Sequence, residues 1–246
     1  MEDYVNQYFS LVTAQLQQVT SQSGAEIRRA AETVAKAIQD GGLLLLYGSG
    51  HSTLIANDAA YRAGGLAPAL LIEDVAHGDA ERLEGLAHYI AARYDLRPPN
   101  VLVIISNSGI NPVPIEMAIL AKAAGVTVIA LTSLAHSKAV PSRHSNGKKL
   151  YELADIVIDT HVAPGDAIVQ LPGSPLKSGA TSTVIGASIL QAITVQAVGL
   201  LIERGQEPPV WRSANLPDSE AFNDHLRTKY GSQLVRYQMA HRPGQK

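Results

Sequence analysis

The chain has 246 residues, of which 46% are hydrophobic and 17% are charged, and its formal net charge at pH 7 is −2. This composition is typical of a soluble globular protein with a sizeable core, and it provides no basic field that would attract nucleic acid or an anionic membrane. Cysteine is absent, which excludes disulfides, and the acidic, polar N-terminus is unlike a signal peptide, so we expect a cytoplasmic protein.

The first part of the chain predicts two helices within residues 2–40, because apolar residues recur there at helical spacing and a Ser-Gln-Ser-Gly stretch interrupts them. Gly41 and Gly42 end the second helix. Short apolar runs then predict five strands, at residues 43–47, 69–72, 101–105, 126–131 and 155–159. Helices are expected between them, at residues 52–62, 79–94 and 112–124, and residues 133–149 are expected to form a loop with one helical turn.

Beyond the fifth strand, a loop rich in proline and glycine is followed by a long helix that opens at residues 178–182 and ends at Glu203. Polar residues interrupt its apolar stretch, so we interpret it as a core helix and not as a membrane span. Another loop, at residues 206–217, precedes a C-terminal helix at residues 218–239.

Strands that alternate with helices predict an α/β fold, a doubly wound five-stranded parallel sheet with helices on both faces. The expected organisation is a pair of N-terminal helices (1–40), a ligand-binding domain (41–205) and a C-terminal loop and helix (206–246). Ligands of such sheets bind beyond the carboxyl ends of the strands.

Three groups of small hydroxyl and glycine residues stand at strand ends and helix starts, at residues 48–52, 106–111 and 181–183. Small residues allow close approach of the backbone to a ligand, and a helix start directs free N–H groups and partial positive charge to the same place. Taken singly, each group is also explained as a tight turn or a helix cap. Together they predict a cradle for a phosphorylated ligand.

Nucleotides are the less favoured ligands. The first turn lacks the third glycine of a dinucleotide fingerprint and the Gly-Lys-Ser/Thr ending of a P-loop. Glu73 and Asp74 follow the second strand, which leaves a ribose contact open on position alone. No clustered histidine and carboxylate spacing indicates a metal site.

The chain resembles the sugar isomerase (SIS) domain proteins, which bind phosphosugars. The resemblance covers about residues 30–205 and rests on the Gly-x-Gly-x-Ser turn at 48–52, the Ser-x-Ser-Gly turn at 106–109 and the Thr-Ser-Thr helix start at 181–183. It implies that the phosphate is held by Ser49, Ser106, Ser108, Asn111 and the hydroxyls of residues 181–183. It also implies a homodimer or a dimer of dimers.

A closer similarity is to the arabinose-5-phosphate isomerases. Their Glu-Ala-x-His-Gly-Asp motif is similar to residues 74–79, which contain His77, and their C-terminal histidine is similar to His225. The resemblance implies that these two histidines act as acid and base, with His225 donated across the dimer. Two positions depart from the family, since its lysine is His51 here and its glutamate is Ile110, and the nearest replacement carboxylate is Glu116.

Phosphosugar etherases supply a competing resemblance. Their catalytic glutamate is matched by Glu84 in a Leu-Glu-Gly segment, and their Arg-Leu-Lys-Ala-Gly stretch is similar to residues 175–179, which contain Lys177. A third alternative is a phosphosugar sensor without catalysis. No cofactor is required for any of these functions, and the sequence does not identify the sugar.

The candidate catalytic residues are therefore His77, Glu84, Glu116 and His225. The candidate substrate-binding residues are Gly48, Ser49, Gly50, His51, Ser52, Ser106, Asn107, Ser108, Gly109, Asn111, Lys177, Thr181, Ser182 and Thr183.

Overall fold

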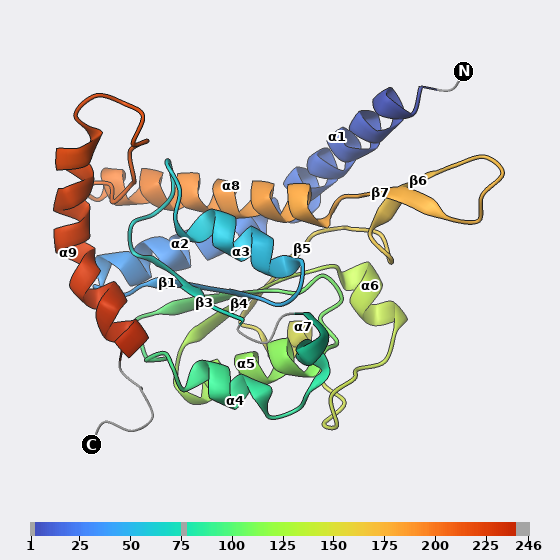
Figure 1. Cartoon of the computed structure of the whole chain (residues 1–246), viewed down its shortest axis with the longest axis horizontal. Helices are drawn as coiled ribbons and strands as arrows, with labels where there is room; N and C mark the ends of the chain where they lie inside the picture. The colour runs from blue at the N-terminus through green and yellow to red at the C-terminus, as the bar shows by residue number, and fades with distance from the viewer. Residues whose placement is uncertain (1–2, 75–77, 240–246) are drawn as a thin grey trace.

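Five parallel strands form the centre of the protein, whose computed structural model describes residues 3–74 and 78–239 (Figure 1). The strand order is β2-β1-β3-β4-β5, which confirms the predicted α/β sheet. The order reverses at β1, so the sheet has a topological switch point between β1 and β3. The strands are β1 (Leu44–Gly48), β2 (Ala69–Ile72), β3 (Val101–Ile105), β4 (Thr127–Thr132) and β5 (Ile156–Asp159).

Both faces of the sheet are covered by helices, which explains why the strands are apolar without alternation. Leu44 and Leu46 pack on one face against α2 (Gly24–Gln39), α3 (Ser52–Ala60) and α8 (Ser182–Glu203). Leu45 and Tyr47 pack on the other face against α4 (Leu86–Ala91), α5 (Pro112–Ala123) and α7 (Leu150–Leu153). Figure 1 shows these two layers above and below the strands.

Two elements project from the layered body at one end (Figure 1). They are α1 (Tyr4–Gln22) and an antiparallel hairpin of β6 (Ala167–Gln170) and β7 (Lys177–Ala180). The hydroxyl of Tyr8 on α1 donates a hydrogen bond of 2.9 Å to the carbonyl oxygen of Ala180, which ties the two together. At the opposite end lies α9 (Ser219–Met239), which packs through Leu226 against Trp211.

Among the described residues, α8 is the one helix long and apolar enough to cross a membrane by length and composition. It packs against α2 and α3, and its Ile185, Ile189 and Ile193 are buried in the core on that face of the sheet. This placement is the one expected of a core helix.

Several predicted boundaries are wrong. The helix expected at 79–94 is a 3₁₀ turn, η1 (Gly78–Arg82), followed by α4, because Gly85 between them has φ of +88°. Residues 178–180 belong to β7, so α8 opens only at Ser182, and the hairpin was not predicted. By contrast, the helical turn expected within residues 133–149 is present as α6 (Leu134–Ala139), which Ser133 caps by accepting a hydrogen bond from the N–H of His136.

Candidate ligand-binding site

The turn after β1 requires glycine. A Cβ at Gly48 would lie 2.5 Å from the carbonyl oxygen of Ser52, and Gly50 has φ of +56°. Only glycine meets both conditions without strain. The turn buries Ser49, whose hydroxyl donates a hydrogen bond of 2.7 Å to Oε2 of Glu81. The Ser49 donor is therefore already engaged with a carboxylate.

The turn after β3 also depends on a glycine, but several of its hydrogen-bond donors have no partner among the described residues. Gly109 has φ of +62°, and its N–H donates to Oγ of Ser106 at 3.2 Å, which leaves the hydroxyl hydrogen of Ser106 able to donate elsewhere. Within the described ranges, no residue hydrogen-bonds to the hydroxyl of Ser108 or to the N–H groups of Asn107 and Ser108. Ser106, Asn107 and Ser108 all line one cavity, so donors without a protein partner gather there.

The start of α8 carries a carboxylate of its own. Oδ1 of Asp166 accepts hydrogen bonds from the N–H groups of Thr181 at 2.9 Å and of Ser182 at 2.8 Å. Oδ2 of Asp166 accepts a third from the hydroxyl of Ser182 at 2.6 Å. An acidic side chain in this position satisfies orphan helix N–H groups and complements the helix dipole.

These three segments meet at one cavity of about 470 Å³. It lies beyond the carboxyl ends of β1 and β3, at the switch point where doubly wound sheets bind ligands. The residues that line it are Ser49, Gly50, His51, Ser52, Glu81, Arg82, Ser106, Asn107, Ser108, Asn111, His136, Asp166 and Ser182.

Some of the predicted ligand-binding residues lie outside this lining. Gly48 and Gly109 shape the two turns without lining the cavity. Thr181 is buried at the N-cap of α8, and Thr183 is exposed on the helix surface. Lys177 is exposed on β7, in the projecting hairpin.

Four cavity residues with ionisable side chains were not predicted, namely Glu81, Arg82, His136 and Asp166. None of them stands at the end of a predicted strand, which is the position that drew attention to the serine turns. Glu81 and Arg82 belong to η1, and Asp166 precedes β6. The Gly-Asp pair at 165–166 is a sequence signal for a turn, but it gives no indication of the helix start 16 residues later that Asp166 caps.

Tyr47, in β1 directly before the first turn, is fully buried. Burial raises the pKa of its phenol well above the ordinary value, and the negative charges of Asp74 and Glu81 raise it further. The phenol therefore stays protonated and neutral at physiological pH, so Tyr47 does not act as a base.

Asn111 stands at the N-cap position of α5, as the Asn-Pro sequence indicates, but its side chain does not cap the helix. Its Oδ1 accepts a hydrogen bond of 2.8 Å from Nη1 of Arg143 instead of from the first turn of α5. The backbone N–H of Arg143 also donates to the carbonyl oxygen of Ile110 at 2.9 Å. The loop after α6 thereby fixes one side of the cavity.

Glu116 is buried but does not line the cavity. Its two carboxylate oxygens accept hydrogen bonds from the N–H groups of Gly85 at 2.6 Å and of Ala87 at 3.4 Å, so it caps α4. Nε2 of His144 lies 3.5 Å from Oε1 of Glu116. The carboxylate of Glu116, on α5, therefore satisfies N–H groups at the start of α4 and is not part of the cavity lining.

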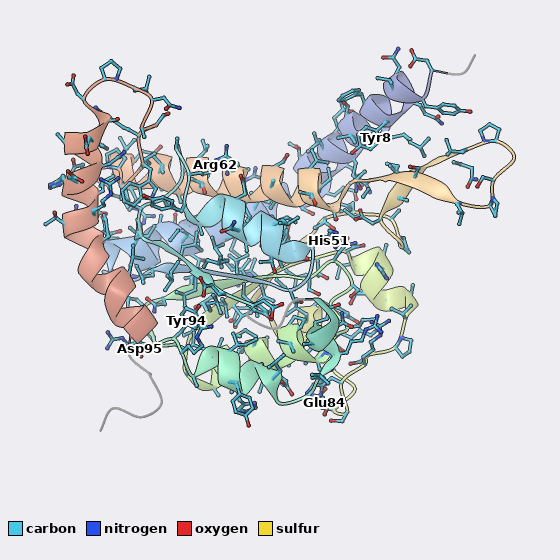
Figure 2. The ribbon with its side chains drawn as sticks, in the orientation of Figure 1. Tyr8, His51, Arg62, Glu84, Tyr94 and Asp95 are labelled. Atoms are coloured by element: carbon cyan, nitrogen blue, oxygen red, sulfur yellow. The ribbon has the colours of Figure 1, made fainter. Side chains whose placement is uncertain are left out.

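Glu84 lies on the α4 side of the molecule, well away from His51 at the cavity (Figure 2). It is exposed, and its carboxylate accepts hydrogen bonds from the N–H of Ser145 at 2.5 Å and from the hydroxyl of Ser145 at 2.8 Å. These bonds lower its pKa from the ordinary value of 4.5. The burial that would raise the pKa of a catalytic acid is not present at Glu84.

The two predicted catalytic histidines are not brought together among the described residues. His77 lies outside the residues that the structure describes. His225 lies on α9, at the end of the molecule away from the hairpin, with its Nε2 3.6 Å from Oε2 of Glu207.

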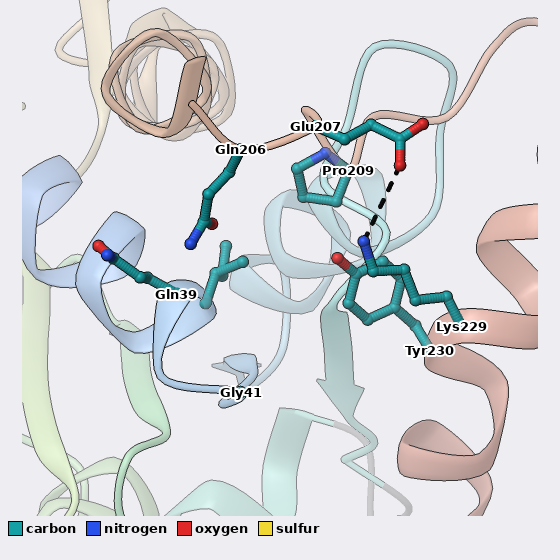
Figure 3. Close-up of a pocket in the computed structure, with 8 residues that line it drawn as sticks. Gln39, Gly41, Gln206, Glu207, Pro209, Lys229 and Tyr230 are labelled. Carbon is teal, nitrogen blue, oxygen red and sulfur yellow. Dashed lines mark ion pairs between the residues drawn. The ribbon is translucent and has the colours of Figure 1, made fainter. Parts of the chain in front are cut away.

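Glu207 also pairs with Lys229 at 3.9 Å, beside a second cavity of about 330 Å³ (Figure 3). This cavity includes Gly41, so it lies at the amino end of the sheet.

Comparison with known proteins identifies a matching domain family and close relatives. The SIS domain matches residues 7–133. A UPF0309 protein of Geobacillus kaustophilus is 40% identical over 239 residues, which cover 94% of this chain and 95% of the relative.

Solved structures share the fold at low sequence identity. A phosphoheptose isomerase from Neisseria gonorrhoeae superposes with a TM-score of 0.58 at 20% identity, over 79% of this chain and 96% of that chain. The Vibrio vulnificus NanR protein complexed with ManNAc-6P superposes with a TM-score of 0.53 at 21% identity, over 98% of this chain and 72% of that chain.

Proposed function

The chain belongs to the SIS domain family and to the UPF0309 proteins, and from that premise we propose that it binds a sugar phosphate in the cavity at the switch point. The observation that carries the proposal is the convergence of two serine turns and a helix start on one cavity of about 470 Å³. A cavity of this size suits a small polar ligand.

The turn after β3 is the proposed phosphate site. The hydroxyls of Ser106 and Ser108 and the N–H groups of Asn107 and Ser108 are unengaged donors within the described part of the chain. Consecutive backbone N–H groups and hydroxyls at a helix start are a common way to bind phosphate. Arg82 lines the same cavity and supplies positive charge.

The sugar is proposed to lie toward the carboxylate of Glu81, on η1. Ionised carboxylates accept hydrogen bonds and donate none, so they suit the hydroxyl groups of a sugar. They are poor neighbours for a phosphate because charges of the same sign repel each other. The uneven distribution of donors and acceptors therefore orients the ligand, with phosphate toward β3 and hydroxyls toward η1.

Aldose–ketose isomerisation is the reaction we propose for this site. The carboxylate of Glu81 would take the proton from one carbon of the sugar and return it to the adjacent carbon, while His51 or His136 moves a proton between the two oxygens. Remote phosphate binding would fix the reacting carbons in place. Support for this step is the position of Glu81, His51 and His136 in the cavity lining.

A non-catalytic sensor is the alternative, and the absence of the family's glutamate at Ile110 favours it. Ile110 is buried, with 4% of its surface exposed, and presents no acid to the cavity. An etherase-like reaction through Glu84 has no support in this geometry, since Glu84 does not line the cavity.

A thermal-shift screen of sugar phosphates tests the binding proposal. A ligand present at about 100 times its dissociation constant should add roughly 2.7 kcal/mol to the free energy of unfolding. The matching unphosphorylated sugars serve as controls and should give no shift. Equal shifts with both sets, or none with any sugar phosphate, would remove the proposal. Conversion of a stabilising aldose phosphate into its ketose then separates the isomerase from the sensor.

We also expect a homodimer, which acts in the cytoplasm. Large apolar side chains are exposed on α1 (Val5 and Phe9) and on α8 (Val195 and Ile202). Pairing through these helices should bury an interface above roughly 1,000 Å². A monomer mass by light scattering at micromolar concentration would contradict it. The role of His225 in a partner's cavity stays a prediction that depends on this assembly.

A further inference from the structure

The N-terminus of α8 is occupied by an acidic side chain from its own chain. The carboxylate of Asp166 accepts three hydrogen bonds of 2.6–2.9 Å, from the N–H and hydroxyl of Ser182 and the N–H of Thr181. Asp166 holds this position with φ of +68°, a left-handed conformation that is uncommon for residues other than glycine. The start of a 22-residue helix is thus filled by an internal anion.

The donors that Asp166 engages are of the kind that a phosphate uses. Helix N–H groups and a serine hydroxyl bind carboxylate and phosphate alike, so the two anions compete for them. Ser182 also lines a small cavity together with Ser52 and Asn107, which places the start of α8 beside both serine turns. A phosphate on the β3 turn would therefore lie next to Asp166.

A buried hydroxyl at the same helix start has no acceptor. Thr181 is 1% exposed, and its Oγ1 has no hydrogen-bond partner among the described residues. Buried hydroxyls in proteins are nearly always hydrogen-bonded, so an unengaged one needs an explanation. Thr181 does not line the cavity, and Asp166 engages only its N–H, so an oxygen of a phosphate could accept from this hydroxyl only after Asp166 has left the α8 terminus.

We propose that Asp166 is an internal anion that holds the α8 terminus while the cavity is empty, and that the phosphate of the ligand displaces it. The inference rests on the proposed function and adds a residue that sets ligand affinity. Binding then exchanges one anion for another at Ser182 and Thr181, and Asp166 is released toward the hairpin. A ligand without a phosphate cannot displace it, so the exchange selects phosphorylated sugars.

The hairpin is the element that this exchange loosens. Asp166 directly precedes β6, and its partners Thr181 and Ser182 directly follow β7, so its hydrogen bonds close the base of the hairpin at the Ala167–Ala180 pair. The hydroxyl of Tyr8 on α1 also holds this base through Ala180. Phosphate binding is therefore expected to leave the hairpin attached chiefly through α1.

Asp166→Asn tests the proposal, because asparagine keeps the shape of the side chain and removes its charge. Titration calorimetry of the full chain with inorganic phosphate, and with any sugar phosphate from the screen, should show affinity about tenfold higher or more in the variant. Asp218→Asn is the matched control, since Asp218 is also acidic and left-handed, with φ of +58°, and lies outside the cavity lining. The control should bind as the unaltered protein does.

Weaker binding by Asp166→Asn would overturn the proposal, because Asp166 would then build the site as a cap. Unchanged binding would also overturn it, since the phosphate would not use the α8 terminus. A second measurement needs no variant: amide hydrogen exchange in residues 167–180 should become faster when phosphate binds the unaltered protein. Slower or unchanged exchange there means that Asp166 stays in place and contradicts the displacement.

The outcomes also separate this inference from the binding proposal. Sugar phosphates that bind the unaltered protein but gain nothing from Asp166→Asn remove the inference alone. Failure of both proteins to bind any sugar phosphate removes the proposed function itself, and the inference with it.

Discussion

The two serine turns at the carboxyl end of the sheet are similar in sequence, but their serine hydroxyls differ in whether they have a hydrogen-bond partner. After β1, the hydroxyl of Ser49 donates to Glu81 at 2.7 Å. After β3, the hydroxyl of Ser108 has no partner among the residues that the structure describes. A strand–turn–helix pattern thus indicates where hydrogen-bond donors lie. Whether those donors already have a partner depends on side chains from distant parts of the chain. We expect this difference between the two turns to govern ligand binding.

The turn after β1 depends on glycine at position 48. Gly48→Ala places a Cβ 2.5 Å from a backbone carbonyl oxygen that cannot move away without breaking the turn. We expect the free energy of unfolding in urea to fall by about 2–3 kcal/mol, the scale of overpacking in a core. Gly199→Ala is the control, because nothing lies within 4 Å of a Cβ there, and it should leave stability equal or higher. Equal stability of the two variants would contradict the geometry of the turn.

Ser108→Ala tests the turn with unengaged donors. Loss of a hydrogen bond to a charged phosphate should weaken sugar-phosphate binding by about 1.5–3 kcal/mol, measured by titration calorimetry. Ser21→Ala serves as its control, since that exposed hydroxyl bonds only to the carbonyl oxygen of Gln18 on α1. Unchanged affinity of a folded Ser108→Ala protein would refute the phosphate site at β3.

Ser49→Ala tests the turn with an engaged donor. Because its hydroxyl already donates to Glu81, we expect sugar-phosphate affinity to fall by less than about 1 kcal/mol. Calorimetry under the conditions used for Ser108→Ala makes the values comparable. If the two variants lose affinity equally, the distinction between the turns is wrong.

Glu84→Gln is expected to have the smallest effect, because Glu84 lies outside the cavity lining. Sugar-phosphate affinity should not change. The pKa of Glu84 is lowered by its bonds to Ser145, so its contribution to stability is present above the unfolded pKa and is lost as pH falls through the folded pKa. Any difference in stability between variant and unaltered protein should thus be full at neutral pH and decrease in acid, once the pH falls below the ordinary pKa of 4.5. A difference that grows in acid would contradict this assignment.

Much of the fold was predictable because its signals are local. The strands at 69–72 and 101–105 were predicted with the bounds that the structure gives, since each is an apolar run between turn residues. The hairpin was missed because β7 is short and contains Lys177, Ser178 and Gly179, residues that do not favour strands. The break at Gly85 was missed because a single glycine does not by itself end a helical pattern.

The sheet, its two covered faces and the positions of the three segments rich in hydroxyl residues follow from local patterns, because apolar runs and glycine turns act on neighbouring residues. Which hydrogen-bond donors in those segments have a partner depends on contacts between distant parts of the chain. Glu81 reaches Ser49 from 32 residues away, with α3 and β2 between them, and Asp166 reaches Ser182 from 16 residues away, with the β6–β7 hairpin between them. Local patterns do not specify such contacts. Tertiary packing likewise brought the carboxylate of Glu116 on α5 to the start of α4, and the carboxylate of Glu84 to Ser145, because a carboxylate binds whichever N–H groups the fold brings within reach.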